Sequence, residues 1–292
     1  MHLIPWSWTP PDAGAPTLRG WHTPPSGKPL LHFLHGNGLC GRAYEPLLAP
    51  LAPHVDLWLC DTPGHGDSDV PRHFPGWNRS AEMALAAFTA HRARFGDVPV
   101  LACGHSFGGV LSTVIAGMPS QPFSRLVLLD PVLFPPMMLH TLQGLSALGL
   151  ARHNPLAKGA ARRRARWPDR QAAFDALHSR GAYRGWADEA LRAFVDHGLR
   201  DEADGVALKC PPALEAEIFG SAPRRLWSSV RRIAVPTLLV HGDGTFPFVA
   251  RAARRAHALN RRIQVQQVPG GHCFMQEHPA DTAARVCDFL VA

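Results

Sequence analysis

The chain has 292 residues, of which 46% are hydrophobic and 18% are charged, as in an ordinary folded protein. This composition excludes an intrinsically disordered chain, and the length allows one large α/β domain or two small ones. The formal net charge is +7, but the densest basic run, 162–166, contains no aromatic ladder. We therefore expect a solvated helix face there and no nucleic-acid partner. The many arginines and alanines are typical of a GC-rich bacterial genome.

Membrane and metal sites are also not expected. No apolar run reaches the roughly 18 residues of a membrane span, and the first residues lack the basic and apolar segments of a signal peptide. The six cysteines form no C-x-x-C pair, so we do not expect a zinc site. We expect a reducing, cytoplasmic location. Cys60 and Cys103 lie inside apolar runs and are expected to be buried.

Strands and helices alternate along much of the chain. The proline-containing residues 1–27 are expected to add an antiparallel hairpin at a sheet edge. Further strands are predicted at 30–34, 55–60, 98–103, 125–129, 237–240 and 263–268. Most of these runs lack alternation, as in parallel strands covered on both faces. Helices are predicted at 80–94, starting at a capping serine, and at 107–116 and 279–291. The order predicts a mostly parallel sheet.

One interval, 131–233, interrupts this alternation. It has no strong strand signal and is rich in Ala, Arg, Leu and Trp at helical spacing. We expect a helical cap above the carboxyl edge of the sheet, where open α/β sheets bind ligands. The core domain would then comprise 1–130 and 234–292. The apolar run 134–139 is either a pocket wall or ordinary cap core.

A nucleophile elbow is indicated by Gly104-His105-Ser106-Phe107-Gly108. This G-x-S-x-G pattern follows a predicted strand and precedes a predicted helix, which is the context that gives it meaning. A tight turn would hold Ser106 in a strained conformation, with glycines leaving room for the packed strand and helix. The backbone N–H of Phe107, at a helix N-terminus, would face a developing oxyanion.

A glycine-rich turn, His35-Gly36-Asn37-Gly38, follows the strand at 30–34. Acyl transfer needs a second oxyanion donor, and we expect the amide of Asn37 to supply it, with the Asn37 side chain as an alternative. His35 is expected to orient this loop.

The base is expected to be His272, in Gly270-Gly271-His272, on a loop between the last strand and the terminal helix. Imidazole has an ordinary pKa near neutrality, which suits proton transfer. His278 is the nearby rival, but it precedes Pro279 and is expected to lie at the surface.

Together these motifs resemble the α/β-hydrolase superfamily. The segments 35–38, 61–68, 104–109 and 271–272 occur in the family's order over nearly the whole chain outside the cap. The resemblance implies an eight-stranded, mostly parallel sheet flanked by helices, a helical cap inserted after strand 6, and a Ser–His–acid triad. It also implies that 61–68 is a structural turn after the fourth strand.

Two aspartates compete for the acid. The family usually carries it after the seventh strand in a G-D-x-D pattern, but here the second aspartate is replaced by Thr245, which leaves Asp243. Asp130, in Leu128-Leu129-Asp130-Pro131, ends the sixth strand, where some branches carry their acid. Either carboxylate would hold the tautomer of His272. We favour Asp130, and expect the other aspartate to cap a loop.

The predicted reaction is hydrolysis of an ester-like, hydrophobic small molecule through Ser106, His272 and Asp130, without metal or organic cofactor. Serine argues against dehalogenase and epoxide hydrolase activity, which the related scaffolds perform with an aspartate. Carbon–carbon bond hydrolase, thioesterase, lactonase and cofactor-free perhydrolase activities use the same triad and remain alternatives. A ligand receptor of the same fold is the non-enzymatic alternative.

Overall fold

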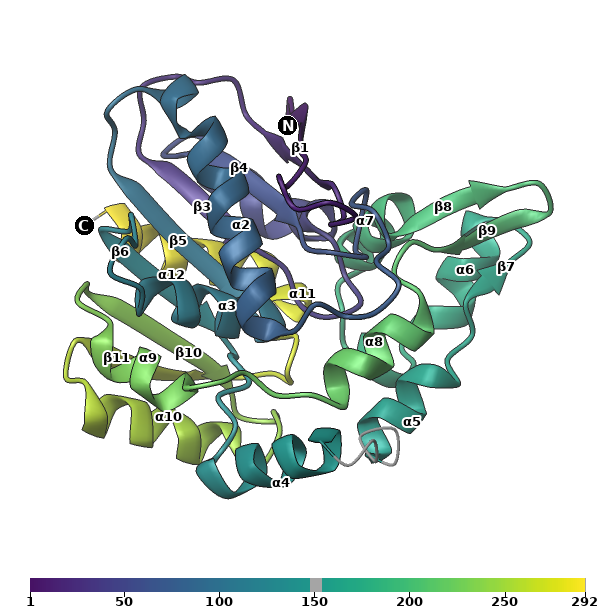
Figure 1. Cartoon of the computed structure of the whole chain (residues 1–292). Helices are drawn as coiled ribbons and strands as arrows, with labels where there is room; N and C mark the ends of the chain where they lie inside the picture. Colours follow the sequence, from purple (N-terminus) through teal and green to yellow (C-terminus); the bar gives the residue numbers. More distant parts are fainter. Residues whose placement is uncertain (148–153, 292) are drawn as a thin grey trace.

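The main feature of the computed structural model, which describes residues 1–147 and 154–291, is an eight-stranded sheet (Figure 1). The strand order is β1-β2-β4-β3-β5-β6-β10-β11. The strands are β1 (Ile4–Trp8), β2 (Leu18–His22), β3 (Leu30–Leu34), β4 (Asp56–Asp61), β5 (Val100–His105), β6 (Arg125–Leu129), β10 (Thr237–Gly242) and β11 (Ile263–Val268). Neighbours from β4 to β11 pair in parallel. The predicted mostly parallel sheet is confirmed, with strand ends within two residues of those expected.

The N-terminal hairpin forms the antiparallel edge of the sheet, as predicted. β1 pairs with β2, and β2 pairs with β4, both antiparallel. Trp6 fastens the hairpin, because its indole N–H donates to the carbonyl of Leu59 at 3.1 Å and its ring stacks on Trp58 at 4.5 Å.

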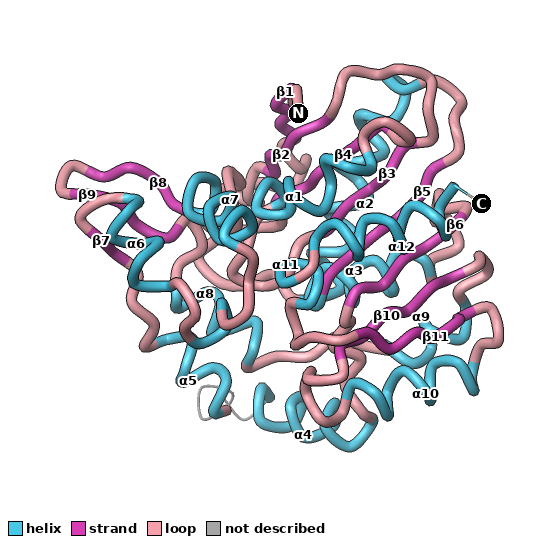
Figure 2. The backbone as a smooth tube through the Cα atoms, turned by 180° about the vertical axis from the view of Figure 1, so that it is seen from behind, coloured by secondary structure: helices cyan, strands magenta, loops and turns pink. Residues whose placement is uncertain are grey.

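Helices cover both faces of the sheet. One face carries α2 (Trp77–Arg92), α3 (Ser106–Ala116), α9 (Leu226–Arg232) and α10 (Val249–Leu259), and the other carries α1 (Glu45–Leu48), α11 (Phe274–Glu277) and α12 (Pro279–Val291). Figure 1 shows α2 and α3 in front of the sheet, and Figure 2, from behind, shows α1 and α12. Along β5, Val100 and Ala102 face the first layer and Leu101 and Cys103 the second. Burial on both faces explains the uninterrupted apolar runs.

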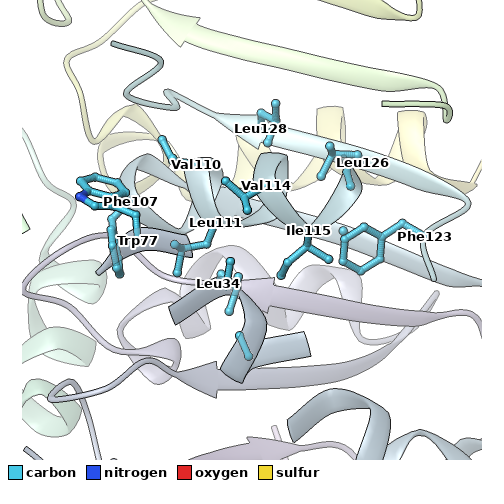
Figure 3. Close-up of a cluster of buried hydrophobic side chains, with 14 of the residues drawn as sticks. Leu34, Trp77, Phe107, Val110, Leu111, Val114, Ile115, Phe123, Leu126 and Leu128 are labelled. Atoms are coloured by element: carbon cyan, nitrogen blue, oxygen red, sulfur yellow. The ribbon is translucent and has the colours of Figure 1, made fainter. Parts of the chain in front are cut away.

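The first helix layer forms a continuous apolar core around α3 (Figure 3). Val110, Val114 and Ile115 of this helix pack with Leu126 and Leu128 of β6. On the edge toward the functional site, Phe107 contacts Trp77 at a ring distance of 4.8 Å. The helix that follows the elbow is therefore anchored along its length. The predicted burial of Cys60 and Cys103 is also confirmed.

The start of α2 differs from the prediction. The helix begins at Trp77 and not at Ser80, because Gly76 adopts a φ of +91° and marks the boundary. Ser80 lies inside the helix, where its hydroxyl donates to the Gly76 carbonyl at 2.9 Å. Ser80 is completely buried, so the predicted capping role is wrong.

The chain between β6 and β10 is helical for much of its length, as expected. Its elements before α9 are α4 (Pro136–Ala147), α5 (Pro155–Ala161), β7 (Arg166–Trp167), α6 (Arg170–Leu177), α7 (Asp188–Gly198), β8 (Leu199–Glu202), β9 (Gly205–Leu208) and α8 (Pro212–Phe219). The strands β7, β9 and β8 form a small antiparallel sheet that was not predicted. They were missed because they are short and β8 carries three charged residues.

We keep the name cap for residues 131–233, whose boundaries stay a prediction. α9 packs against α3 and α10, and α7 packs against α1. None of the described helices is long and apolar enough to cross a membrane.

Candidate active site

The elbow joins β5 to α3 and carries Ser106 at its tip. Ser106 has a φ of +53°, in the left-handed region that L residues rarely occupy. A Cβ on Gly108 would lie 2.2 Å from the carbonyl oxygen of Leu34, and one on Gly104 would lie 2.5 Å from that of Gly108. The two glycines are required because helix and strands approach so closely here. The strained turn lifts the Ser106 hydroxyl above the sheet edge.

Three predicted site residues form one chain of hydrogen bonds. The Ser106 hydroxyl donates to Nε2 of His272 at 2.8 Å, and Nδ1–H of His272 donates to the Asp130 carboxylate at 2.6 Å. Asp130 is completely buried, and Ser106 is 8% exposed. They come from the ends of β5 and β6, and His272 comes from the loop after β11. This arrangement can move a proton from the hydroxyl to the imidazole.

The buried side chain of Asp130 accepts hydrogen bonds from three donors. Besides His272, the N–H of Gly242 donates to it at 2.9 Å and the Thr245 hydroxyl donates to its other oxygen. Its own N–H bonds the Val240 carbonyl at 2.7 Å. Thr245 stands where the family pattern has its second aspartate, so the replacement residue now supports an acid on the neighbouring strand. Sequence reasoning missed this contact.

Asp243 has a different role in the loop. Its carboxylate accepts the N–H of Gly270 at 3.0 Å, and the side chain is exposed. Among the residues that the structure describes, it makes no hydrogen bond to His272. The structure therefore brings Asp130, and not Asp243, to the imidazole. The rival base His278 is exposed, as expected.

The oxyanion loop is fixed by a relay of neutral histidines. Nδ1–H of His35 donates to the Gly36 carbonyl at 2.9 Å, and its Nε2 accepts the N–H of Thr62 at 3.0 Å. Nδ1 of His65 lies 3.1 Å from both the Thr62 hydroxyl and the Pro63 carbonyl, and Nε2 of His65 lies 3.2 Å from Oδ1 of Asn37. Burial lowers the pKa of His35 to about 4 and that of His65 to about 3, so both rings stay neutral.

The Asn37 side chain is thus occupied at both ends. Its Nδ2–H donates to the Glu215 carbonyl of the cap at 3.2 Å, while Oδ1 is taken by His65. This leaves the backbone N–H as the better oxyanion donor of Asn37. The N–H of Phe107 lies in the first turn of α3, where helix amides have no intrahelical partner.

A second relay, which sequence reasoning missed, connects the oxyanion loop to the base. The Gly36 N–H donates to the Tyr44 hydroxyl at 3.0 Å, which in turn donates to Nδ1 of His105 at 2.6 Å. Nε2–H of His105 donates to the His272 carbonyl at 3.0 Å. Burial, with a contribution from His272, lowers the pKa of His105 well below 6.5. A neutral His105 therefore fixes the backbone of His272. In the sequence, the only feature that pointed to a role for His105 was its position inside the G-x-S-x-G motif.

The turn at 61–68 is structural, as the resemblance implies. The Asp61 carboxylate accepts the N–H groups of Gly41 at 2.8 Å and Asp67 at 3.0 Å. The Ser68 hydroxyl donates to the Asp61 carbonyl at 2.6 Å. Burial raises the pKa of Asp61 to about 6.

A cavity of about 640 Å³ lies between core and cap and is open to Ser106 and His272. Asn37 and Phe107 also line it. Its wall is largely apolar and includes Trp77, Val132, Phe134, Met138, Leu156, Trp186, Ile218, Phe219, Phe246 and Phe248. Of the apolar run 134–139, Phe134 and Met138 reach this wall, whereas Met137 is 81% exposed.

The arginine run does not form a solvated helix face, which corrects the prediction. Arg162 and Arg164 are exposed, but Arg163 turns inward and its side chain is only 21% exposed. Its guanidinium pairs with Glu215 at 2.6 Å and lines the cavity.

In the described part of the chain, no group of three or more His, Cys, Asp or Glu side chains is suited to a metal ion.

The chain is similar to several known hydrolases. The chain is 34% identical to monoglyceride lipase of Mus musculus over 130 residues, which is 42% of this chain and 42% of that protein. It is 27% identical to the type I acyl-CoA thioesterase mpaH of Penicillium roqueforti over 183 residues, or 57% of this chain and 39% of that protein. The chain thus matches only about two fifths of the length of these curated relatives.

Among solved structures, E-2-(acetamidomethylene)succinate hydrolase superposes over 100% of both chains with a TM-score of 0.76 and 25% identity. The match to the alpha/beta hydrolase family covers residues 33–285. The chain therefore belongs to the alpha/beta hydrolase family.

Proposed function

We propose that the protein is a serine hydrolase that cleaves a carboxylic ester or related acyl compound through an acyl-enzyme. One observation carries the proposal: hydrogen bonds of 2.8 and 2.6 Å join Ser106, His272 and Asp130, and Ser106 and His272 line the cavity. Nucleophile, base and orienting acid in this order are the parts that acyl transfer requires.

In the first step, His272 takes the proton of Ser106 as Oγ attacks the substrate carbonyl. The imidazolium that forms is stabilised by the buried Asp130 carboxylate, which also keeps Nδ1 protonated beforehand. The amides of Phe107 and Asn37 are the proposed donors to the oxyanion, and preorganised donors of this kind need no rearrangement during the reaction.

In the second step, Nε2–H of His272 protonates the leaving group and the acyl group stays on Ser106. A water molecule then loses a proton to the same nitrogen and attacks the acyl carbonyl. The bond between that carbonyl and Oγ breaks as Nε2–H returns its proton to Ser106, and the carboxylic acid is released. The His105 relay supports both steps because it fixes the His272 carbonyl at 3.0 Å. The proposal includes no cofactor or metal, a small-molecule substrate and a cytoplasmic location.

Covalent labelling tests the proposal. A fluorophosphonate probe should modify Ser106 of the wild type, as read by mass spectrometry of the labelled peptide, and leave Ser106→Ala unmodified. A panel of p-nitrophenyl esters should be hydrolysed by the wild type, and Ser106→Ala should lose at least about 10⁴-fold in kcat. Folded wild type that neither reacts with the probe nor cleaves esters, but binds small ligands, would instead be a receptor.

A thioester is the second candidate substrate, supported by the named activity of the mpaH relative. The same triad would attack a thioester carbonyl, with a thiol as leaving group. Release of free thiol from short acyl-thioesters, measured with a chromogenic disulfide, separates the candidates by their kcat/KM relative to esters of the same acyl group.

A further inference from the structure

The cavity wall carries an excess of positive charge on the cap side. Arg163, Arg164 and Arg180 line it, and Glu215 is the one acidic side chain among its described lining residues. Arg164 and Arg180 are exposed and Arg163 is partly buried. Arginine is always protonated in proteins, so the wall attracts anions even after Glu215 is counted.

Arg163 is held in place by two side chains. Nη1–H donates to Oε2 of Glu215 at 2.6 Å, and Nη2–H donates to the Tyr183 hydroxyl at 2.5 Å. A guanidinium has five N–H donors, so these bonds leave others for a ligand. The Tyr183 hydroxyl also has its own proton to donate, and no acceptor for it is found in the part of the chain that the structure describes. A rigid donor set of this kind is suited to a planar carboxylate.

The donor set lies against the oxyanion loop. A Cβ on Gly38 would be 3.2 Å from Nη1 of Arg163 and 3.0 Å from the Glu215 carboxyl group. Gly38 follows Asn37, whose amide is the proposed oxyanion donor. The leaving group has to lie beside His272, which protonates it. An anion held against the oxyanion loop is therefore assigned to the acyl part, a few bonds from the carbonyl that Ser106 attacks.

We propose that the substrate carries a carboxylate at the far end of a short acyl chain, and that Arg163 and Tyr183 bind it. This inference rests on the proposed serine-hydrolase function and names its substrate class. A monoanionic carboxylate fits better than a phosphate dianion, because Glu215 already balances one of the arginine charges at 2.6 Å. Arg164 and Arg180 attract the anion toward the cavity, and the apolar wall takes the methylene chain.

Matched ester pairs test the substrate class. Mono-p-nitrophenyl esters of succinic, glutaric and adipic acid are compared with p-nitrophenyl esters of the unbranched monocarboxylic acids of equal chain length. Buffer hydrolysis is subtracted, because the free carboxylate can attack its own ester. The wild type should prefer at least one anionic ester over its neutral partner by at least about 10-fold in kcat/KM, equivalent to about 1.4 kcal/mol.

Three variants assign the preference to residues. Arg163→Gln combined with Glu215→Gln removes both charges of the pair, and the preference should fall to about 1 while neutral esters are still cleaved. Glu215→Gln alone keeps the cation and should raise the preference. Arg162→Gln is the matched control, since Arg162 is exposed and lies outside the cavity wall, and it should change neither rate.

The outcomes separate this inference from the proposed function. Neutral esters cleaved without preference for any anionic partner would overturn the inference and leave the serine hydrolase intact. A preference that survives in the double variant, or that appears only for acyl groups joined to a phosphorylated leaving group, would also overturn it. If Ser106 is not labelled and no ester is cleaved, both proposals fail. Competitive inhibition of neutral-ester cleavage by free glutarate in the wild type, lost in the double variant, supports the inference independently of ester reactivity.

Discussion

The core and the cap meet at one cavity, but different kinds of interaction position the side chains on its two sides. The core side contributes Ser106 and Asp130 from the ends of the neighbouring strands β5 and β6, where parallel pairing fixes the backbone, and His272 from the loop after β11. The cap side contributes Arg163 and Tyr183, which are positioned by side-chain contacts to each other and to Glu215. Under the proposed function, the core side carries out acyl transfer and the cap side selects the substrate.

The largest effect should come from Asp130→Asn. An amide at this position can donate to Nδ1 of His272 and so favour the wrong tautomer, and we expect kcat to fall about 10⁴-fold with little change in KM. Asp243→Asn is the matched control, because among the described residues the Asp243 side chain bonds only the loop amide of Gly270, at 3.0 Å, and it should keep kcat within about 3-fold. A loss that is larger for Asp243→Asn would refute the assignment of the acid.

Glycine-to-alanine substitutions in the two regions should have opposite signs. In Gly108→Ala the new Cβ would meet the Leu34 carbonyl at 2.2 Å, so we expect the free energy of unfolding to fall by about 3 kcal/mol or more. In Gly144→Ala of the cap helix α4 the Cβ meets nothing within 4 Å, and we expect a gain of about 0.5–1 kcal/mol. Urea denaturation measures both changes, and equal effects would show that Gly108 is not tightly packed against the Leu34 carbonyl.

Thr245→Val tests the support of the acid. The variant keeps the shape but removes the hydroxyl that donates to Asp130, so we expect kcat to fall about 10-fold while the protein stays folded. Thr141→Val in the cap removes a comparable hydroxyl, which donates to the Met137 carbonyl at 3.0 Å. It should leave kcat unchanged. The comparison is made at saturating ester across pH 6–9, and an unaltered kcat for Thr245→Val would mean that Thr245 only fills space.

The sequence was informative where a site depends on local geometry. The strand–turn–helix context predicts the elbow at Ser106, and the order of segments predicts His272 on the loop before the last helix. The acid could not be decided in the same way, because Asp130 and Asp243 both follow strand ends. What separates them is the pairing of β6 with β10, which places Asp130 beside Gly242.

The cap was less predictable for a related reason. Arg163 appeared to belong to a solvated basic run, because its partner Glu215 is 52 residues away and nothing in the local pattern indicates the contact. Similarly, Thr245 looked like a lost acid, although its hydroxyl reaches Asp130 over 115 positions. Long-range side-chain pairs of this kind have no period or turn signature, so only the folded chain reveals them.

Acid should weaken the core through its buried histidines. Burial lowers the pKa of His32 and His65 to about 3 and that of His35 to about 4, and also lowers that of His105. Below pH 6.5 the unfolded chain binds these protons and the folded chain does not, so stability present above pH 6.5 is lost as pH falls. Each of these histidines lowers the free energy of unfolding by about 1.4 kcal/mol for each pH unit by which the pH falls between 6 and 4.5.

Asp61 acts in the opposite direction in part of this window. Burial raises its pKa to about 6, so as the pH falls the folded chain binds this proton before the unfolded chain does. Proton binding by Asp61 therefore stabilises the folded chain at low pH, and this stabilisation is lost as the pH rises through 6. One such carboxyl group offsets about one histidine, and the net effect of lowering the pH from 6 to 4.5 remains destabilising.

His32→Leu isolates one member of the group. Neither ring nitrogen of His32 has a hydrogen-bond partner within the described ranges, and the ring stacks on Trp58 at 5.1 Å. We expect Leu to raise the free energy of unfolding by about 1 kcal/mol at pH 7, and by about 1.4 kcal/mol more for each pH unit below 6.5. His140→Leu, at an exposed position of the cap, should follow the wild-type pH dependence. Urea denaturation at pH 7, 6 and 5 decides: parallel curves for His32→Leu and wild type would mean that His32 does not contribute to the acid sensitivity of the core.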